Sequence, residues 1–337
     1  MGEIKRSESC KFGYCTTMSQ ENEIIRPKVQ WIEITEELAG QRLDNFLLAR
    51  LKGVPKSRIY RIVRKGEVRI NKGRCQAKQR LAMGDIVRIP PVRTAQRDKQ
   101  SFVPPKLEKH LRQNILFEDE FMLIINKPSG FAVHGGSGIN SGIIEALRCM
   151  RPESKYLELV HRLDKGTSGC LLLAKKRSAL AHLHELFRTD RVHKSYLALI
   201  SGQWQRKKMW VTAPLQKNVQ KGGERMVVVN QAGKTAETFI KRLQKFEYAT
   251  LVEVSPKTGR THQIRVHTAW LGHPIVGDDR YGDSEVNGLF KSKGHKRLFL
   301  HAEKLELEHP ETEQIISITA PIPDDFNDLL NDSKNLS

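Results

Sequence analysis

Short strand-like segments follow one another through most of the chain after residue 113, and they constrain the fold more than any other feature. Only residues 141–150 and 178–189 in this part have a helical pattern. Parallel neighbours need a long crossover, usually a helix, so a series of strands without helices favours antiparallel pairing. We therefore expect an α+β fold with a mixed, largely antiparallel sheet flanked by helices. The predicted strands are residues 121–126, 170–174, 196–200, 226–229, 239–243, 249–254, 298–307 and 314–319.

Residues 41–92 carry a large share of the positive charge. They hold 14 Lys+Arg and 3 Asp+Glu, or +11, out of 57 − 38 = +19 for the 337-residue chain. Apolar spacing predicts helices at 43–51 and 55–65, and alternation predicts strands at 68–70 and 86–89. A dense basic surface on a small α/β module is typical of phosphate contacts with nucleic acid. The expected RNA contacts are Lys56, Arg58, Arg61, Arg64 and Lys65 of the second helix and Arg69 of the strand after it.

The composition also predicts where the domains begin and end. Residues 93–112 are polar and basic and contain Pro104-Pro105, which indicates a linker. The predicted organisation is a disordered tail at 1–30, the basic module at 31–92, the linker at 93–112, a larger domain at 113–325 and a C-terminal tail at 326–337.

Several classes of protein are excluded by what the sequence lacks. No apolar run approaches the roughly 18 residues of a membrane span, and the first 30 residues lack the apolar stretch of a secretory signal. We therefore expect a cytoplasmic protein with no membrane partner. No P-loop and no strand-associated GxGxxG motif is present, and no His or Cys pair has zinc-site spacing. We expect neither a small-molecule cofactor nor a metal.

One loop concentrates groups that carry chemistry. Residues 161–169, HRLDKGTSG, lead directly into the predicted strand at 170–174 and place Asp164 between Arg162 and Lys165. Cationic neighbours favour the ionised carboxylate. The pattern alone leaves two interpretations open, a functional carboxylate or an Asp that caps a turn and pairs with the lysine.

This loop resembles the signature of the RluA family of pseudouridine synthases. NKPSG at 126–130, PKTGRTHQIRVH at 256–267 and the GHPI, GDDRYG run at 272–282 resemble further motifs of that family, in the same order. Residues 31–92 resemble the S4 RNA-binding domain. The resemblance implies an isomerase, an intramolecular transferase without a cofactor, in which an S4-like domain precedes the synthase domain.

The resemblance also implies roles for individual residues. Asp164 would be the catalytic carboxylate, Tyr196 would stack on the target base, and Arg265 would hold Asp164 by a charge-assisted contact, bidentate if both oxygens are engaged. Arg162 would fill the gap that a flipped base leaves, and Thr167 and Ser168 would contact the RNA backbone. His161 would either orient the loop or touch RNA.

The expected substrate is 23S ribosomal RNA or its large-subunit precursor, modified during ribosome biogenesis by a monomeric enzyme. The same chemistry on transfer RNA or on other ribosomal uridines is the main alternative, because the fold and the reacting groups do not specify the RNA. A non-catalytic RNA-binding assembly factor is a second alternative. A third is another S4-bearing enzyme, such as an RNA methyltransferase or an aminoacyl-tRNA synthetase, but no donor or nucleotide site is recognisable.

Overall fold

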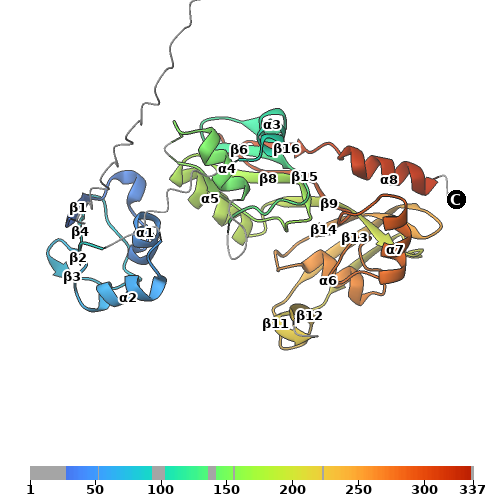
Figure 1. Ribbon diagram of the computed structural model, residues 1–337, viewed down its shortest axis with the longest axis horizontal. Helices are drawn as coiled ribbons and strands as arrows, with labels where there is room; N and C mark the ends of the chain where they lie inside the picture. The colour runs from blue at the N-terminus through green and yellow to red at the C-terminus, as the bar shows by residue number, and fades with distance from the viewer. Residues whose placement is uncertain are drawn as a thin grey trace, which may run out of the picture. The chain divides into compact units, whose positions relative to one another are not determined.

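The chain forms two compact units, which divide between Asp98 and Lys99 and are called here the small unit and the large unit (Figure 1). A computed structural model describes residues 28–51, 53–92, 103–135, 142–154, 156–221 and 224–334. The tail predicted at 1–30 lies outside these residues except for its last three. Among the helices of the described residues, none is long and apolar enough to cross a bilayer.

The small unit packs two helices against a four-stranded sheet of order β1-β4-β2-β3. The predicted helices are confirmed, and the apolar face of the second one, with Ile59, Ile62 and Val63, is buried while its basic face is exposed. The strand β1 was not predicted from the sequence. The elements are β1 (Gln30–Glu33), a 3-10 turn (Glu36–Leu38), α1 (Leu43–Arg50), α2 (Lys56–Arg64), β2 (Arg69–Ile70), β3 (Gly73–Arg74) and β4 (Ile86–Ile89).

The large unit is built on a ten-stranded sheet whose main order is β10-β13-β14-β9-β15-β8-β6-β5. The β8–β15 pair is parallel and the other pairs are antiparallel, so the predicted mixed, largely antiparallel sheet is confirmed. Its strands are β5 (Ile115–Glu118), β6 (Met122–Lys127), β7 (Glu158–Leu159), β8 (Ser168–Ala174), β9 (His193–Ser201), β10 (Lys208–Thr212), β13 (Glu237–Lys245), β14 (Ala249–Pro256), β15 (Leu300–Glu308) and β16 (Ile315–Thr319). A separate hairpin pairs β11 (Leu215–Lys221) with β12 (Glu224–Val229). The helices are α3 (Pro105–Gln113), α4 (Ile143–Met150), α5 (Arg177–Arg188), α6 (Gln263–Trp270), α7 (Ser284–Ser292) and α8 (Asp324–Lys334).

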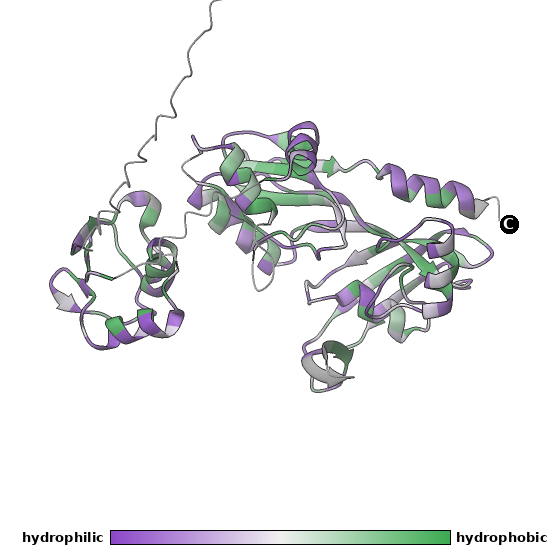
Figure 2. Cartoon of the chain, viewed as in Figure 1, coloured by the Kyte–Doolittle hydropathy of each residue, from purple (hydrophilic) through white to green (hydrophobic). Residues whose placement is uncertain are grey.

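The central strands β6 and β8 are buried on both faces. Leu123 and Leu171 pack with residues of α3 and α4, whereas Ile124 and Leu172 pack with residues of α5. Strands covered on both faces have continuous apolar runs rather than alternation, and Figure 2 shows these strands in green between the helices. This doubly covered centre is rigid, and the loop that carries Asp164 enters it directly.

The second half of the predicted linker is a helix, so the linker prediction is wrong from Pro105 onward. The helix α3 begins with Pro105 at its first turn, where a missing N–H has no cost. Its residues Leu107 and Leu111, four apart and therefore on one face, are 3% and 1% exposed against α4 and β6. The polar and charged residues around them gave the segment its linker-like composition.

The predicted C-terminal tail at 326–337 is also mostly a helix. The helix α8 runs to Lys334 and buries Phe326 and Leu329 completely. Phe326 packs edge-on against Phe299, with ring centroids 5.3 Å apart. Acidic residues in its first turn, Asp324 and Asp325, complement the helix dipole. The polar residues within 326–337 gave the segment its tail-like composition.

Replacing Leu111 by Ala tests whether α3 belongs to the core of the large unit. We expect Leu111→Ala to lower the free energy of unfolding by about 2–5 kcal/mol, because a buried Leu leaves a cavity. The matched control is Lys109→Ala on the exposed face of the same helix, which we expect to change stability by less than about 0.5 kcal/mol. Chemical denaturation followed by circular dichroism measures the stability of both variants. Equal changes in stability would show that α3 does not belong to the core.

Candidate active site

The loop between β7 and β8 presents Asp164 from a tight turn. The backbone N–H of Thr167 donates to the carbonyl of Asp164 at 3.1 Å, which closes the turn. A neighbouring segment braces it from outside, since Gly130 N–H donates to Lys165 O at 2.9 Å and Ser129 Oγ donates to Gly166 O at 2.7 Å. The carboxylate therefore projects from a backbone that is fixed on both sides.

Gly169 is required where this loop enters the sheet. Its φ is +108°, and a Cβ there would lie 2.2 Å from the carbonyl oxygen of Ala302 on β15. Only glycine allows the two parallel strands to approach this closely. The preceding Ser168 is fully buried, and its Oγ accepts from Arg297 Nη2 at 2.6 Å. The predicted contact of Ser168 with RNA is therefore wrong, because its side chain has no exposed surface.

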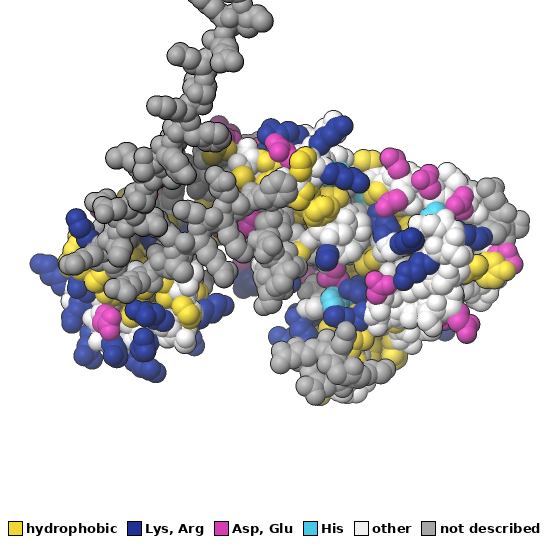
Figure 3. Space-filling view, viewed as in Figure 1, with side chains coloured by type: hydrophobic (Ala, Val, Ile, Leu, Met, Phe, Trp, Pro, Cys, Tyr) yellow, Lys and Arg dark blue, Asp and Glu magenta, His cyan; other side chains and the backbone are white. Residues whose placement is uncertain are grey.

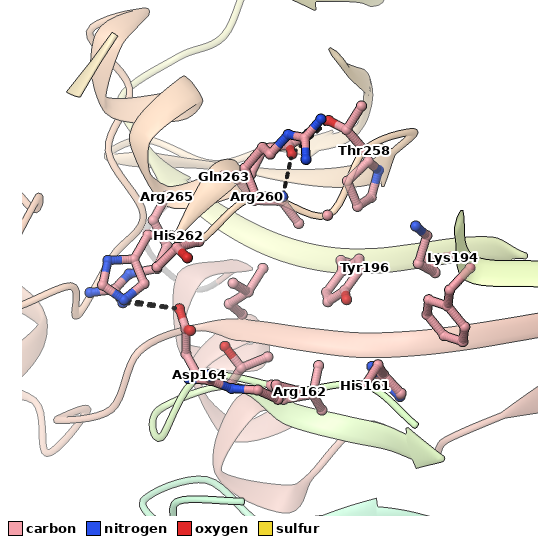
Figure 4. A pocket seen from close by; sticks show the side chains of 18 of the residues that line it. His161, Arg162, Asp164, Lys194, Tyr196, Thr258, Arg260, His262, Gln263 and Arg265 are labelled. Atoms are coloured by element: carbon pink, nitrogen blue, oxygen red, sulfur yellow. Dashed lines mark hydrogen bonds and ion pairs between the residues drawn. The ribbon is translucent and has the colours of Figure 1, made fainter. Parts of the chain in front are cut away.

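Asp164 lies in a cleft of about 450 Å³ in the large unit. Figure 4 shows Asp164 and Arg162 on one side, His262 and Arg265 on the other, and Tyr196 on β9 between them. The lining side chains include His161, Arg162, Asp164, Thr167, Lys194, Tyr196, Thr258, Arg260, His262, Gln263 and Arg265. The structure thus brings together in one cleft all the residues predicted for the active-site region except Ser168.

Arg265 joins two carboxylates. Its Nη1 donates to Asp164 Oδ2 at 3.1 Å, while Nε and Nη2 donate to the two oxygens of Asp278 at 2.7 and 2.8 Å. The contact with Asp164 that the sequence predicts is present, but the bidentate contact is made with Asp278 instead. The ring of Tyr281 lies 5.1 Å from the guanidinium and closes the remaining face.

The charges of this trio stabilise one another. Burial raises the pKa of Asp278, but the hydrogen bonds and charge of Arg265 outweigh it and hold that pKa below its ordinary value. For Arg265, burial lowers the pKa, and the hydrogen bonds and charges of Asp278 and Asp164 raise it above its ordinary value. With side-chain exposures of 12% for Arg265 and 0% for Asp278, the pair is shielded from water.

A side-chain network positions the start of α6, which carries Arg265. Gln263 is 4% exposed; its Nε2 donates to Glu237 O at 2.8 Å and its Oε1 accepts from the N–H of Arg260 at 3.0 Å. Thr258 Oγ1 donates to the same oxygen at 2.7 Å. The motif at 256–267 therefore folds back onto β13, and this fixes the direction in which Arg265 leaves the helix.

His262 lies next to Asp164 in a conformation that is rare for a residue with a side chain. It is the N-cap of α6 with φ at 53°, in the left-handed region. Its Nε2 is 3.8 Å from Asp164 Oδ2, and its Nδ1 is 2.9 Å from the hydroxyl of Tyr281. Burial lowers the pKa of His262, although the charge of Asp164 opposes this. The ring is therefore neutral at pH 7 and is able to accept a proton.

Tyr196 and Lys194 form the floor of the cleft on β9. Burial, and secondly the charge of Asp164, raises the pKa of Tyr196 above its ordinary value, so it remains a neutral phenol. Burial lowers the pKa of Lys194, whose Nζ lies 5.7 Å from the ring centroid of Phe187. The floor of the cleft thus combines a neutral aromatic ring with a partly buried amine.

His161 has a contact that orients the loop. Its Nε2 accepts the backbone N–H of Leu172 at 3.0 Å, and its ring stacks on Phe187 with centroids 5.1 Å apart. Burial, together with the charge of Lys194, lowers the pKa of His161 to about 3. Of the two roles predicted for His161, the structure provides the contacts for orientation.

Arg162 is exposed at the mouth of the cleft, and Thr167 is 2% exposed within its wall.

Sequence reasoning missed three residues of the site, His262, Asp278 and Tyr281. All three belong to the motifs at 256–267 and 272–282, so the motifs marked the segments without indicating that their side chains converge. Within the described residues, no group of three or more His, Cys, Asp or Glu side chains is arranged to hold a metal ion. The chemistry available in the cleft is that of a carboxylate, a neutral imidazole and a phenol.

The basic residues predicted in the small unit lie on one helix and one strand. Lys56, Arg58, Arg61, Arg64 and Lys65 are exposed on α2, and Arg69 is half-buried on β2. They belong to the small unit, whereas the cleft residues belong to the large unit.

Comparisons with known proteins match both units. Residues 121–270 match the family model described as RNA pseudouridylate synthase, and residues 41–87 match that of the S4 domain. Ribosomal large subunit pseudouridine synthase C of Yersinia pestis is 57% identical over 298 residues, 88% of this chain and 93% of that protein. Its namesake from Escherichia coli (strain K12) is 54% identical over 313 residues, 92% of this chain and 98% of that protein. The solved structure of human RNA Pseudouridylate Synthase Domain Containing 4 is 29% identical, with a TM-score of 0.57 over 68% of this chain and 96% of that one.

The chain therefore belongs to the RNA pseudouridylate synthase family and carries an S4 domain. The predictions of family, of fold class and of an isomerase are confirmed. The segments at 53–72, 132–138, 174–180 and 297–305 predicted a closer resemblance to the member of the family named C, and both bacterial relatives above bear that name.

Replacing Arg265 by Met tests how strongly Asp278 depends on it. We expect Arg265→Met to lower the free energy of unfolding by about 3–5 kcal/mol at pH 7, because it leaves a buried carboxylate without its cation. The matched control is Arg112→Met, which removes an exposed ion pair with Glu108 in α3 and should cost no more than about 0.5 kcal/mol.

The loss of stability in Arg265→Met should depend on pH in a defined direction. In the wild type the pKa of Asp278 lies below the ordinary value of 3.8, so the stability from this pair is complete above that pH and is lost as the pH falls through the folded-state pKa. In Arg265→Met, burial alone raises that pKa, so the stability gap to the wild type should narrow between pH 7 and pH 4. A stability gap between the two proteins that stays constant over this pH range would contradict the conclusion that Asp278 depends on Arg265.

Proposed function

We propose that this protein isomerises specific uridines of large-subunit (23S) ribosomal RNA to pseudouridine, with Asp164 as the catalytic carboxylate. The observation that carries the proposal is the Asp164 carboxylate held by Arg265 Nη1 at 3.1 Å in a cleft whose floor is Tyr196. The names of the bacterial relatives support the choice of RNA.

The reaction needs little more than a positioned carboxylate. It breaks the bond between C1′ and N1, turns the uracil and joins C5 to C1′, so no atom enters or leaves the substrate except exchanged protons. No group donor and no redox cofactor is required. Asp164 either attacks the sugar or the base, or removes a ribose proton. Each route needs a positioned carboxylate, and Arg265 Nη1 holds Asp164 Oδ2 at 3.1 Å.

The target uridine must leave its stack to reach Asp164. Extrusion of a base costs a few kcal/mol, and stacking on an aromatic ring contributes about 1–3 kcal/mol per base in return. Tyr196, as a neutral phenol, provides that ring without placing a charge beside the uracil. A cleft of about 450 Å³ is within the range of small-molecule sites, and Arg162 at its mouth replaces the extruded base.

The proton balance gives His262 a role. C5 loses a proton and N1 gains one during the reaction. The neutral imidazole of His262, whose Nε2 is 3.8 Å from Asp164 Oδ2, is able to exchange a proton with that carboxylate or with a base bound beside the two side chains. Tyr281 holds the ring in place at Nδ1.

The small unit contributes affinity rather than chemistry. Figure 3 shows Lys and Arg side chains around its visible face, and phosphate contacts of this kind position a protein on RNA without reading its bases. A ribosomal RNA substrate supports the cytoplasmic location that the sequence predicts. The monomeric state stays a prediction from the sequence.

Replacing Asp164 by Asn tests the catalytic assignment. Asp164→Asn keeps the shape and a hydrogen-bond acceptor for Arg265 but removes the charge, so we expect turnover to fall by at least about 10²-fold while RNA affinity is unchanged. The matched control is Asp279→Asn, whose carboxylate is 88% exposed beside the site, and which should keep full activity. Tritium release from 5-³H-uridine RNA measures turnover, and an active Asp164→Asn protein would refute the assignment.

Mapping pseudouridine in cellular RNA tests the substrate. Carbodiimide labelling and primer extension compare RNA from cells with and without the gene. We expect signals to vanish from large-subunit RNA and to return with the wild-type gene but not with Asp164→Asn. If the pseudouridine signals vanish from transfer RNA instead, the proposed chemistry is retained but the proposed substrate is wrong. If no signal changes, the result favours a non-catalytic RNA-binding protein.

Removing one cation of α2 tests the role of the small unit. We expect Arg61→Gln to weaken binding to all RNA sequences alike and to reduce the slope of log K against log[salt] by about 1, because one phosphate contact is lost. Arg188→Gln removes an exposed cation of α5 that is paired with Glu185, and it should leave the slope unchanged. Filter binding at several salt concentrations measures both.

A further inference from the structure

Four side chains form a row across the sheet of the small unit. In the strand order β1-β4-β2-β3, Trp31 lies opposite Arg88, Arg88 lies opposite Arg69, and Arg69 lies opposite Arg74. Directly opposed residues of antiparallel strands project from the same face. One tryptophan and three arginines therefore share one face, and we call them the Trp–Arg row.

This face is the outer one. The neighbouring row, Ile32, Val87 and Ile70, points to the core, with Val87 at 0% and Ile70 at 7% exposure. Trp31, by contrast, is 57% exposed. A single exposed apolar residue is common on protein surfaces; an indole aligned with three guanidinium groups is a more specific arrangement.

The arginines are held in place and yet retain donors. Arg88 Nη1 donates to Glu67 O at 2.7 Å, and Arg69 Nη1 donates to Lys72 O at 3.1 Å. The guanidinium carbon of Arg88 lies 5.9 Å from the centroid of the Trp31 ring. None of the three arginines makes an ion pair with a residue that the structure describes. Because each guanidinium has five N–H donors, most of them are available to a ligand.

The row ends beside the C-terminal end of α2. Arg74, at its far end, lies beside Gly66, where a Cβ would be 3.4 Å from Arg74 Nε. Gly66 follows the last turn of α2, which carries Arg64. Three strand spacings of about 4.8 Å make the row about 14 Å long, enough for a few nucleotides. The same face also carries Glu33, two residues from Trp31 and opposite Ile86.

We propose that the Trp–Arg row is a second RNA-contact surface, which binds a single-stranded segment with its phosphates on the arginines and an unpaired base on Trp31. This inference rests on the proposed function, because it takes RNA as the partner. Positive charge matches the phosphates, and an exposed aromatic ring requires a base that is not already stacked in a helix. The surface thus distinguishes single-stranded from paired RNA, which the basic face of α2 does not.

Two RNA probes test the inference on the full chain. One is a blunt hairpin, and the other is the same hairpin with a single-stranded adenosine extension, which contains no target uridine. We expect Trp31→Leu to weaken binding of the extended probe by about 5- to 150-fold, the range that stacking of one base gives, and to leave the blunt probe unaffected. Trp31→Phe, which keeps an aromatic face, should recover most of the loss.

The matched control is Trp210→Leu. Trp210 is also 57% exposed but lies on β10 of the large unit, and it should alter neither probe. Arg74→Gln should reduce the salt slope for the extended probe by about 1 and leave that for the blunt probe unchanged. Lys109→Gln, an equal charge change on α3, should alter neither slope.

The outcomes separate this inference from the proposed function. If Trp31→Leu weakens the binding of both probes equally, or weakens neither, the Trp–Arg row is not a single-strand site. A stability loss in Trp31→Leu with unchanged RNA binding would instead indicate that the face is covered by protein. The binding assay is repeated in the Asp164→Asn background, so an error in the catalytic assignment would not change its result.

Discussion

The bridge that Arg265 makes between Asp164 and Asp278 is the interaction on which the site depends. Asp278 takes the bidentate contact and is fully buried, so it fixes the plane of the guanidinium. Asp164, with 32% of its side chain exposed, receives one remaining donor through a single oxygen. Asp278 thus anchors Arg265, whereas a different carboxylate, that of Asp164, faces the cleft. Arg265 contacts Asp164 only at Oδ2, so the proposed function uses the oxygen that Arg265 does not contact.

This bridge spans 101 residues of sequence and needs the central sheet to form. The parallel approach of β8 and β15 at Gly169 sets the position of the Asp164 loop. The Gln263 network sets the direction of α6. Parallel pairing and long-range contacts are formed late and at a high cost in chain entropy. The rigid, doubly covered strands β6 and β8 supply the stability that allows a loop residue to be held so closely.

The sequence predicts this fold where local periodicity is strong and fails where few residues carry the signal. The helices of the small unit and the central strands follow from their apolar spacing. The helix α3 has only Leu107 and Leu111 as an apolar face, so its polar residues and Pro104-Pro105 gave the pattern of a linker. The contact between Asp164 and Arg265 was expected from motifs. Asp278 was not, because no local pattern relates it to Arg265 through space.

Burial favours the neutral forms of three other groups of the cleft. It lowers the pKa of Lys194 and of His262 and raises that of Tyr196. Uracil is a neutral base and has to lose its own hydration and stacking to enter. Tyr196 offers the uracil a neutral ring, and in the proposed function the phosphates are held by the exposed cations of α2. The cations proposed to hold the RNA are thus carried by the small unit, whereas the pair of Asp164 and Arg265 proposed to act on the base is carried by the large unit.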